Sequence, residues 1–256
     1  MQIVNLQDEN YLEAFTKFWF DFQPYSYQKR FLKECLTSNR VAGIWCRQSG
    51  KSQTVAVYSL AKCLIERTTI LIIAPTQSQS RELYNKVREL AMNRDMIKAQ
   101  IVKSTETEMR FENGSRIISL PSGPTGATIR GYTADIVILE EAQGLKDGIV
   151  NTVITPMLAS KKDKGQLIKI GTGWIKNHFY HSCVDDKKYK VVKVNWKEVV
   201  EAGQYSEEFI NEQKANLMDI EFQTEYGAEF ITDINSFFPS QLVESCCDNY
   251  DLWKND

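Results

Sequence analysis

Residues 40–52 have the sequence Arg-Val-Ala-Gly-Ile-Trp-Cys-Arg-Gln-Ser-Gly-Lys-Ser, which combines a strand, a turn and the start of a helix. The apolar run 41–46 predicts the strand, and the apolar spacing after Ser52 predicts the helix. In loops of this kind backbone N–H groups wrap a phosphate, the lysine reaches the β and γ oxygens, and the next hydroxyl binds Mg²⁺. The stretch therefore predicts a nucleotide-binding P-loop.

The loop departs from the pattern GxxxxGK[ST] at one position, because Trp45 stands where that pattern has its first glycine. Gly50 remains where the backbone must approach phosphate closely. An ordinary helix start on a surface loop is the alternative interpretation, but the flanking strand and helix favour the P-loop. The ATP-binding residues predicted here are Arg47, Gln48, Ser49, Gly50, Lys51 and Ser52.

Length and composition indicate a soluble globular protein with one large domain, or one domain and a small appendage. The chain has 256 residues, of which 43% are hydrophobic and 25% charged, and its net charge is -2. This charge gives no support to a DNA partner, although a local basic face remains compatible with one.

The sequence predicts a protein that stays in the cytosol where it is made. It has no apolar run of about 18 residues and no N-terminal signal peptide. Its six cysteines are scattered without C-x-x-C spacing, as expected of reduced thiols. His178, His181 and Cys183 suggest a zinc site only weakly, because no fourth ligand accompanies them.

The segment before the P-loop predicts two helices. The first 23 residues are rich in aromatic side chains and predict an amphipathic helix that packs on the main body. Gln28 follows Pro24, and its amide has the acceptor and donors needed to bind the edge of adenine. A plain helix start after Pro24 explains the same residues equally well.

The segments after the P-loop predict an α/β fold whose mostly parallel sheet is covered by helices on both faces. Short apolar runs at 69–74, 166–171 and 190–194 are typical of strands buried in such a sheet. Residues 109–120 predict an antiparallel hairpin centred on Asn113-Gly114. The remaining predicted elements are helices at 81–92, 206–216 and 219–225 and a last strand at 228–232.

Polar residues follow the predicted strands where a P-loop enzyme needs them. Four apolar residues precede Glu140 and Glu141, which predicts two carboxylates at a strand tip, the first for Mg²⁺ and the second to polarise the attacking water. Helix capping is the alternative for these acids. Thr172 ends another strand, where it could contact the γ-phosphate or simply form a turn. The turn-rich segment 121–133 predicts a mobile loop over this edge, with Arg130 near its end.

Taken together, these motifs resemble those of the ATPase domain of the large terminase subunit, the DNA-packaging motor of tailed bacteriophages. The resemblance covers most of the chain. Its motifs are the Arg-Gln pair before Ser49-Gly50-Lys51-Ser52, the Ala-Pro-Thr at 74–76, the Ile-Arg-Gly at 129–131, the acidic strand at 135–142 and the segment 219–230.

The resemblance implies a role for each matching residue. Lys51 and Ser52 would hold phosphate and Mg²⁺, and Glu140 would bind Mg²⁺ through water, although the family usually has Asp there. Glu141 would be the catalytic carboxylate. The remaining roles are Gln28 in the adenine motif, Arg47 as γ-phosphate sensor, Arg130 as an arginine finger acting in trans and Thr172 in the coupling motif, which here lacks the proline often found after it.

The resemblance also implies an ASCE or RecA-like ATPase core at 1–195, a small helical lid at 196–232 and the start of a linker at 233–256. The family's nuclease domain is not expected in this chain, so nuclease activity is not expected either. The implied partners are double-stranded DNA, further copies of the chain in a ring, the portal protein and the small terminase subunit, with no membrane. The implied location is the host cytoplasm and, transiently, the procapsid.

Two alternatives to a packaging motor remain open. A helicase-like, DNA-dependent ATPase would share Gln28, the P-loop and the acidic strand tip, but needs a second RecA-like lobe. A nucleotide-binding module with weak hydrolysis would explain the departures at Trp45 and Glu140.

Overall fold

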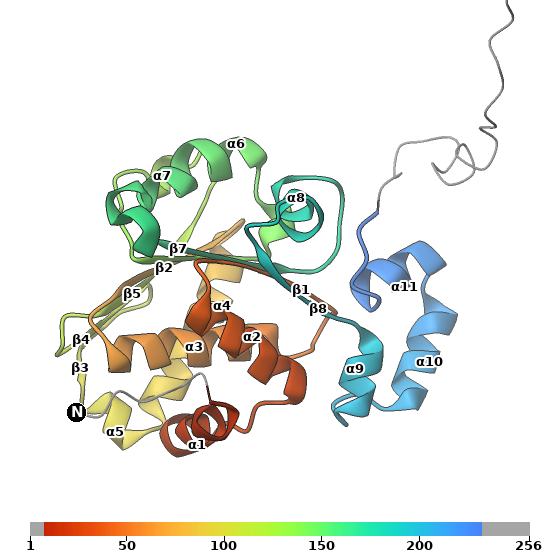
Figure 1. Ribbon diagram of the computed structural model, residues 1–256, viewed down its shortest axis with the longest axis horizontal. Helices are drawn as coiled ribbons and strands as arrows, with labels where there is room; N and C mark the ends of the chain where they lie inside the picture. Colours follow the sequence, from red (N-terminus) through yellow and green to blue (C-terminus); the bar gives the residue numbers. More distant parts are fainter. Residues whose placement is uncertain (1–7, 232–256) are drawn as a thin grey trace, which may run out of the picture.

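The computed structural model describes residues 8–231, which contain one eight-stranded sheet in the order β3-β4-β5-β2-β6-β7-β1-β8 (Figure 1). In the part of this order that runs from β5 through β2, β6, β7 and β1 to β8, each strand is parallel to its neighbours. β3 and β4 add an antiparallel edge. The mostly parallel sheet predicted from the sequence is therefore confirmed. The strands are β1 (Arg40–Trp45), β2 (Thr69–Ala74), β3 (Ile101–Ser104), β4 (Glu108–Phe111), β5 (Arg116–Pro121), β6 (Ile136–Glu140), β7 (Gln166–Gly171) and β8 (Lys190–Val194).

Helices cover both faces of this sheet (Figure 1). One face carries α1 (Glu9–Phe20), α2 (Ser26–Thr37), α3 (Lys51–Ile65), α4 (Gln77–Met92) and α5 (Asp95–Lys98). The other face carries α6 (Asp147–Ile149), the π-helical turn Val150–Ile154, α7 (Thr155–Met157) and α8 (His178–Val184). Three 3₁₀ turns, at Ala127–Ile129, Ala142–Gly144 and Ala159–Lys164, complete the connections.

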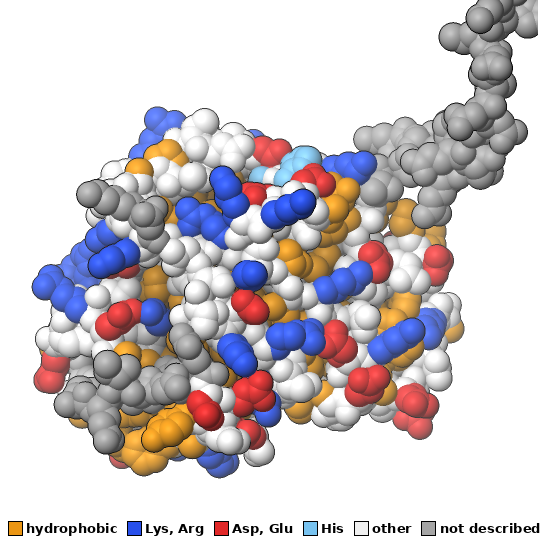
Figure 2. All heavy atoms as spheres, in the orientation of Figure 1, with side chains coloured by type: hydrophobic (Ala, Val, Ile, Leu, Met, Phe, Trp, Pro, Cys, Tyr) orange, Lys and Arg blue, Asp and Glu red, His pale blue; other side chains and the backbone are white. Residues whose placement is uncertain are grey.

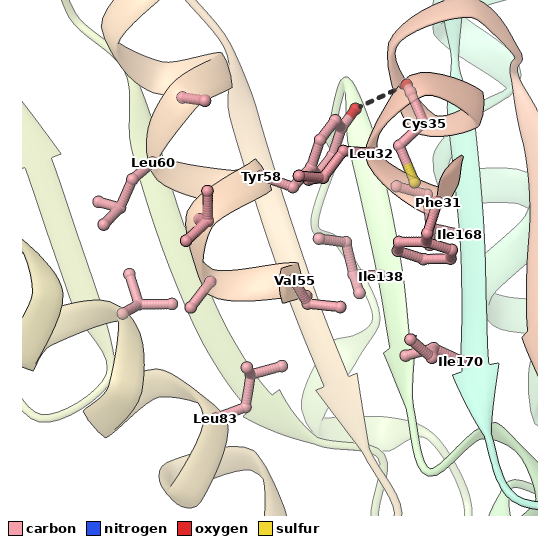
Figure 3. Packing of buried hydrophobic residues seen from close by; sticks show 14 of the residues in the cluster. Phe31, Leu32, Cys35, Val55, Tyr58, Leu60, Leu83, Ile138, Ile168 and Ile170 are labelled. Carbon is pink, nitrogen blue, oxygen red and sulfur yellow. Dashed lines mark hydrogen bonds between the residues drawn. The ribbon is translucent and has the colours of Figure 1, made fainter. Parts of the chain in front are cut away.

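The apolar strands are buried because helices lie on both of their faces. Figure 3 shows this packing on the first face, where α2, α3 and α4 lie over Ile138 of β6 and over Ile168 and Ile170 of β7. Tyr58 is also fully buried there, and its hydroxyl donates to the carbonyl of Cys35 at 3.2 Å. Apolar burial of this kind is the main source of stability in such a core.

The strand order brings the predicted motifs to one edge of the sheet. β7 lies between β1 and β6, so the P-loop after β1, the acids ending β6 and Thr172 after β7 all lie at neighbouring carboxyl ends. Such an edge is where open α/β sheets bind ligands. Within residues 8–231, no helix is long and apolar enough to cross a membrane.

Three short helices form a lid beside β8 (Figure 1). They are α9 (Trp196–Glu201), α10 (Glu207–Asn216) and α11 (Asp219–Glu225), and we refer to residues 196–226 as the lid. The backbone N–H of Arg47 donates to the carbonyl of Glu225 at 2.8 Å, which ties the P-loop to α11. The domain boundaries remain a prediction, and the predicted linker at 233–256 lies outside the described residues.

Two predicted elements differ from the structure. The predicted strand at 228–232 is not formed over its described residues, 228–231, because Ala228 has a left-handed φ of 56°, outside the extended region. Residue 232 lies outside the described residues. α4 begins at Gln77, four residues earlier than predicted, because Thr76 and Gln79 form a capping box. The hairpin between β4 and β5 is confirmed, with Gly114 at φ 84°.

Candidate functional site

A cavity of about 620 Å³ lies at the carboxyl edge of the sheet. It is lined by the P-loop, by the acids that end β6, by Thr172 and by residues of α4 and the lid. The residues that line it are Arg47, Gln48, Gly50, Lys51, Ser52, Gln53, Gln79, Glu82, Leu83, Lys86, Glu140, Glu141, Gln143, Gly144, Thr172, Trp174 and Glu225.

The P-loop ends at the N-terminus of α3, which presents its free backbone N–H groups to the cavity edge. Gly50 has φ 82°, a conformation that glycine adopts without steric cost. A Cβ at this position would also lie 2.5 Å from Nε2 of Gln28. Gly50 is therefore required both by its backbone conformation and by the space around it.

Lys51 and Glu141 face each other in the cavity. Nζ of Lys51 lies 4.0 Å from Oε1 of Glu141, and the lysine side chain is only 8% exposed. Glu141 has a left-handed φ of 49°, a strained conformation of a kind that clusters at functional sites. In this geometry a phosphate bound in the loop would compete with Glu141 for the lysine ammonium group.

Ser52 and Glu140 form a second pair in the same cavity. Oγ of Ser52 donates to Oε1 of Glu140 at 2.7 Å. Glu140 is buried, and its Oε2 has no hydrogen-bond partner among the described residues. Burial, together with the charge of Glu141, raises the pKa of Glu140 to about 7. A hydroxyl beside an unpartnered carboxylate oxygen fits Mg²⁺, which prefers oxygen ligands.

The raised pKa gives a prediction about stability. Because Glu140 ionises near pH 4.5 in an unfolded chain and near 7 in the folded one, it destabilises the metal-free fold as pH rises from about 4.5 to 7. Glu140→Gln should therefore raise the free energy of unfolding at pH 8, on the order of 1 to 3 kcal/mol, with little change at pH 4. Urea unfolding without Mg²⁺ measures this. The account of Glu140 fails if the variant is equally destabilised at both pH values.

Gln143 connects the two strand tips, a contact that we did not predict from the sequence. Its Nε2 donates to Oε2 of Glu141 at 2.5 Å and to Oγ1 of Thr172 at 3.0 Å. A Cβ on Gly171 would lie 2.0 Å from Oε1 of Gln143, so the neighbouring strand must leave room for the amide. The arrangement fixes the orientation of Glu141 relative to Thr172.

The other loop residues divide into two groups. Arg47 and Gln48 line the cavity, and Nε of Arg47 lies 3.4 Å from Oε2 of Glu225 on α11. Ser49 is buried, and its Oγ donates to the carbonyl of Cys46 at 2.7 Å. The side chain of Ser49 thus stabilises the conformation of the loop and does not line the cavity.

Gln28 and Arg130 do not line the cavity. Gln28 is buried, and its Oε1 accepts a hydrogen bond from the backbone N–H of Tyr25 at 2.9 Å, capping α2. Its contact with adenine stays a prediction, and one that would require the amide to become accessible. Arg130 is exposed and forms no hydrogen bond or ion pair with any described residue. Its predicted action in trans is likewise untested.

The histidines considered for zinc have other partners. Nδ1 of His178 lies 3.1 Å from Nζ of Lys169, and Nδ1 of His181 lies 2.5 Å from Oδ2 of Asp185. Burial lowers the pKa of Lys169 to about 8 and that of His178 to about 4. Over residues 8–231, no group of three or more His, Cys, Asp or Glu side chains is arranged to hold a metal ion.

The chain is similar in sequence to terminase large subunits. A family model described as "Terminase large subunit, T4likevirus-type, N-terminal" matches residues 45–245. The terminase large subunit of Thermus virus P23-45 is 25% identical over 236 residues, covering 79% of this chain and 48% of that protein. The chain thus spans about half the length of the curated relatives that it matches.

Solved structures show the same fold. The large terminase ATPase domain of Thermus phage P74-26 superposes with a TM-score of 0.69 at 22% identity, covering 86% of this chain and 98% of that one. A large terminase from a thermophilic bacteriophage, solved in complex with ADP, has a TM-score of 0.60 at 10% identity, covering 80% and 53%. The P-loop fold predicted from the sequence is therefore confirmed.

Proposed function

This chain belongs to the terminase large subunit family, T4likevirus-type, and we propose that it is an ATP-hydrolysing motor that drives double-stranded DNA into a procapsid. The observation that carries the proposal is the convergence of Lys51, Ser52, Glu140 and Glu141 on one cavity. Complexes of the thermophilic bacteriophage's large terminase with ADP and with ATP-gamma-S support ATP as the ligand.

Four residues of the cavity, Lys51, Ser52, Glu140 and Glu141, have distinct tasks in this reaction. The N–H groups of the P-loop bind the β-phosphate, and Lys51 binds the β and γ oxygens in place of Glu141. Ser52 and Glu140 would hold Mg²⁺, which would supply positive charge to the phosphates. When the ammonium group of Lys51 pairs with phosphate and no longer with Glu141, Oε1 of Glu141 is free to accept a proton from the attacking water.

Two further residues, Gln143 and Thr172, orient Glu141 and connect it to the tip of β7. Gln143 keeps Oε2 of Glu141 fixed while Oε1 acts on the water. Nε2 of Gln143 donates to Thr172 as well as to Glu141. A movement of Thr172 at the β7 tip would therefore be transmitted to the Glu141 carboxylate through the Gln143 side chain. This contact supports the coupling role proposed for Thr172.

The partners and location are proposals that rest on the family. Double-stranded DNA, a ring of identical chains, the portal protein and the small terminase subunit would act in the host cytoplasm and on the procapsid. Acidic and basic side chains are interspersed over the face seen in Figure 2, so charge on that face does not single out a DNA-binding surface. The exposed Arg130, unpaired among the described residues, supports a site completed by a neighbouring chain.

Nucleotide binding tests the proposed function. Wild-type protein should bind a fluorescent ATP analogue in the presence of Mg²⁺, and Lys51→Ala should weaken binding at least about tenfold by removing a charge-assisted contact. Lys103→Ala is the matched control, because Lys103 lies outside the cavity on β3 and pairs with Glu108 at 2.9 Å. If the wild-type protein binds no nucleotide, or if both variants bind equally well, the proposed function is wrong.

A further inference from the structure

Side chains contact the backbone carbonyl groups of residues 46–49 in the P-loop. Residues 46–49 each direct a backbone carbonyl toward a donor from outside the phosphate cavity. Ser49 Oγ donates to the carbonyl of Cys46 at 2.7 Å, the Tyr205 hydroxyl to that of Arg47, and Gln204 Nε2 to that of Gln48 at 2.6 Å. The hydroxyl oxygen of Tyr27 lies 3.2 Å from the carbonyl oxygen of Ser49.

Two of these donors come from the lid. Gln204 and Tyr205 lie in the turn between α9 and α10, whereas Tyr27 lies on α2. Tyr27 and Gln204 are also joined to each other, because Oε1 of Gln204 accepts the proton of the Tyr27 hydroxyl at 2.5 Å. Burial raises the pKa of both tyrosines, so their hydroxyls stay protonated and able to donate.

The loop needs such support because its own sequence is unfavourable. Gln48 has φ 52°, a conformation that costs a residue with a side chain free energy and persists only where its surroundings impose it. Trp45, at the position of the missing glycine, is fully buried and packs edge-on against Tyr27, with ring centroids 5.4 Å apart. The surrounding side chains thus impose the loop shape that glycines would otherwise permit.

We propose that Gln204 and Tyr205 are positioning residues of the nucleotide site, through which the lid holds the P-loop in its phosphate-binding shape. With the carbonyls turned outward, the N–H groups of residues 48–50 would be left to bind the phosphate, whereas that of Arg47 is held by the carbonyl of Glu225. Phosphate binding and lid attachment then favour each other, and this coupling is reciprocal. The inference rests on the proposed function, because it takes the phosphate to be that of a nucleotide.

Tyr205→Phe is the sharpest test, because it removes one hydroxyl and keeps the ring against Phe209 and Tyr226. The variant should bind ADP with Mg²⁺ about 5- to 20-fold more weakly than wild type. Gln204→Glu should weaken ADP binding as well, since it keeps the acceptor for Tyr27 but loses the donor to Gln48. Tyr226→Phe is the matched control: its hydroxyl pairs with Gln213 in the lid at 3.3 Å, and its ADP affinity should not change.

Hydrogen exchange separates positioning from general damage to the lid. ADP should slow amide exchange in residues 203–206 of the wild-type protein, and this protection should be lost in Tyr205→Phe but kept in Tyr226→Phe. Wild-type ADP affinity in Tyr205→Phe, or equal weakening in the two variants, would overturn the inference and leave the proposed function standing. Failure of the wild-type protein to bind ADP would overturn both.

Discussion

Replacing Glu141 with glutamine is expected to slow ATP hydrolysis by about 10²- to 10⁴-fold, the range attributable to a general base. Glutamine preserves the size of the side chain but cannot accept a proton from water. Because the substitution removes the carboxylate that competes with phosphate for Lys51 and leaves the P-loop untouched, the dissociation constant for ATP should stay the same or fall. Phosphate release and equilibrium binding of a nucleotide analogue, measured on the same preparation, give the two quantities.

Glu82→Gln is the matched control for this experiment. Glu82 lines the same cavity from α4, but its carboxylate lies 3.8 Å from Lys86 and its side chain is 73% exposed. Its hydrolysis rate should remain near that of wild type. If Glu141→Gln hydrolyses ATP at a rate close to that of wild type, Glu141 is not the base.

Arg130→Ala is expected to lower the hydrolysis rate by about 10³- to 10⁵-fold without changing ATP affinity, as loss of an arginine finger does in other NTPases. Arg130 is exposed, forms no ion pair with the described residues and lies outside the cavity of its own chain. An arginine finger supplied by a neighbour must have these properties. The exposed Arg110, which pairs with Glu108 on the antiparallel edge, provides the control Arg110→Ala.

Mixing two inactive variants tests whether the site is shared. In a mixture of Glu141→Gln and Arg130→Ala chains, some sites combine an intact Glu141 with an intact Arg130 from the neighbouring chain. Hydrolysis should therefore recover in the mixture although each variant alone is inactive. If Arg130→Ala is as active as wild type at every protein concentration, the arginine acts neither in trans nor in cis.

The site residues that could be predicted are those fixed by local sequence and strand order. Lys51, Ser52, Glu140, Glu141 and Thr172 closely follow apolar runs, and parallel strands bring their carboxyl ends to the same edge. Predicting these strands was thus enough to predict that the residues converge.

The supporting contacts could not be predicted in this way. Gln143 bridges Glu141 and Thr172 only because β6 and β7 are neighbours, and Gln204 reaches the P-loop from 156 positions further along the chain. Such contacts depend on tertiary packing and leave no period or spacing in the sequence. The same holds for residues 228–231, whose apolar pattern suggested a strand but whose Phe230 instead packs against Phe179 and Tyr180.

Gln28 shows a different limit. Its place before the P-loop matched the adenine motif, and the structure also gives it a capping role on α2. A role that depends on a ligand, as for Gln28, or on a second chain, as for Arg130, cannot be derived from the contacts of one chain alone.

The central claim is that this cavity hydrolyses ATP in a site completed by a neighbouring chain. The most direct test is the rate of phosphate release per chain, measured with Mg²⁺ over a wide range of protein concentration. We expect the rate per chain to rise with concentration as chains associate, and to stay near background in Glu141→Gln throughout. A rate per chain that is constant over the whole range, or that persists in Glu141→Gln, would contradict the account.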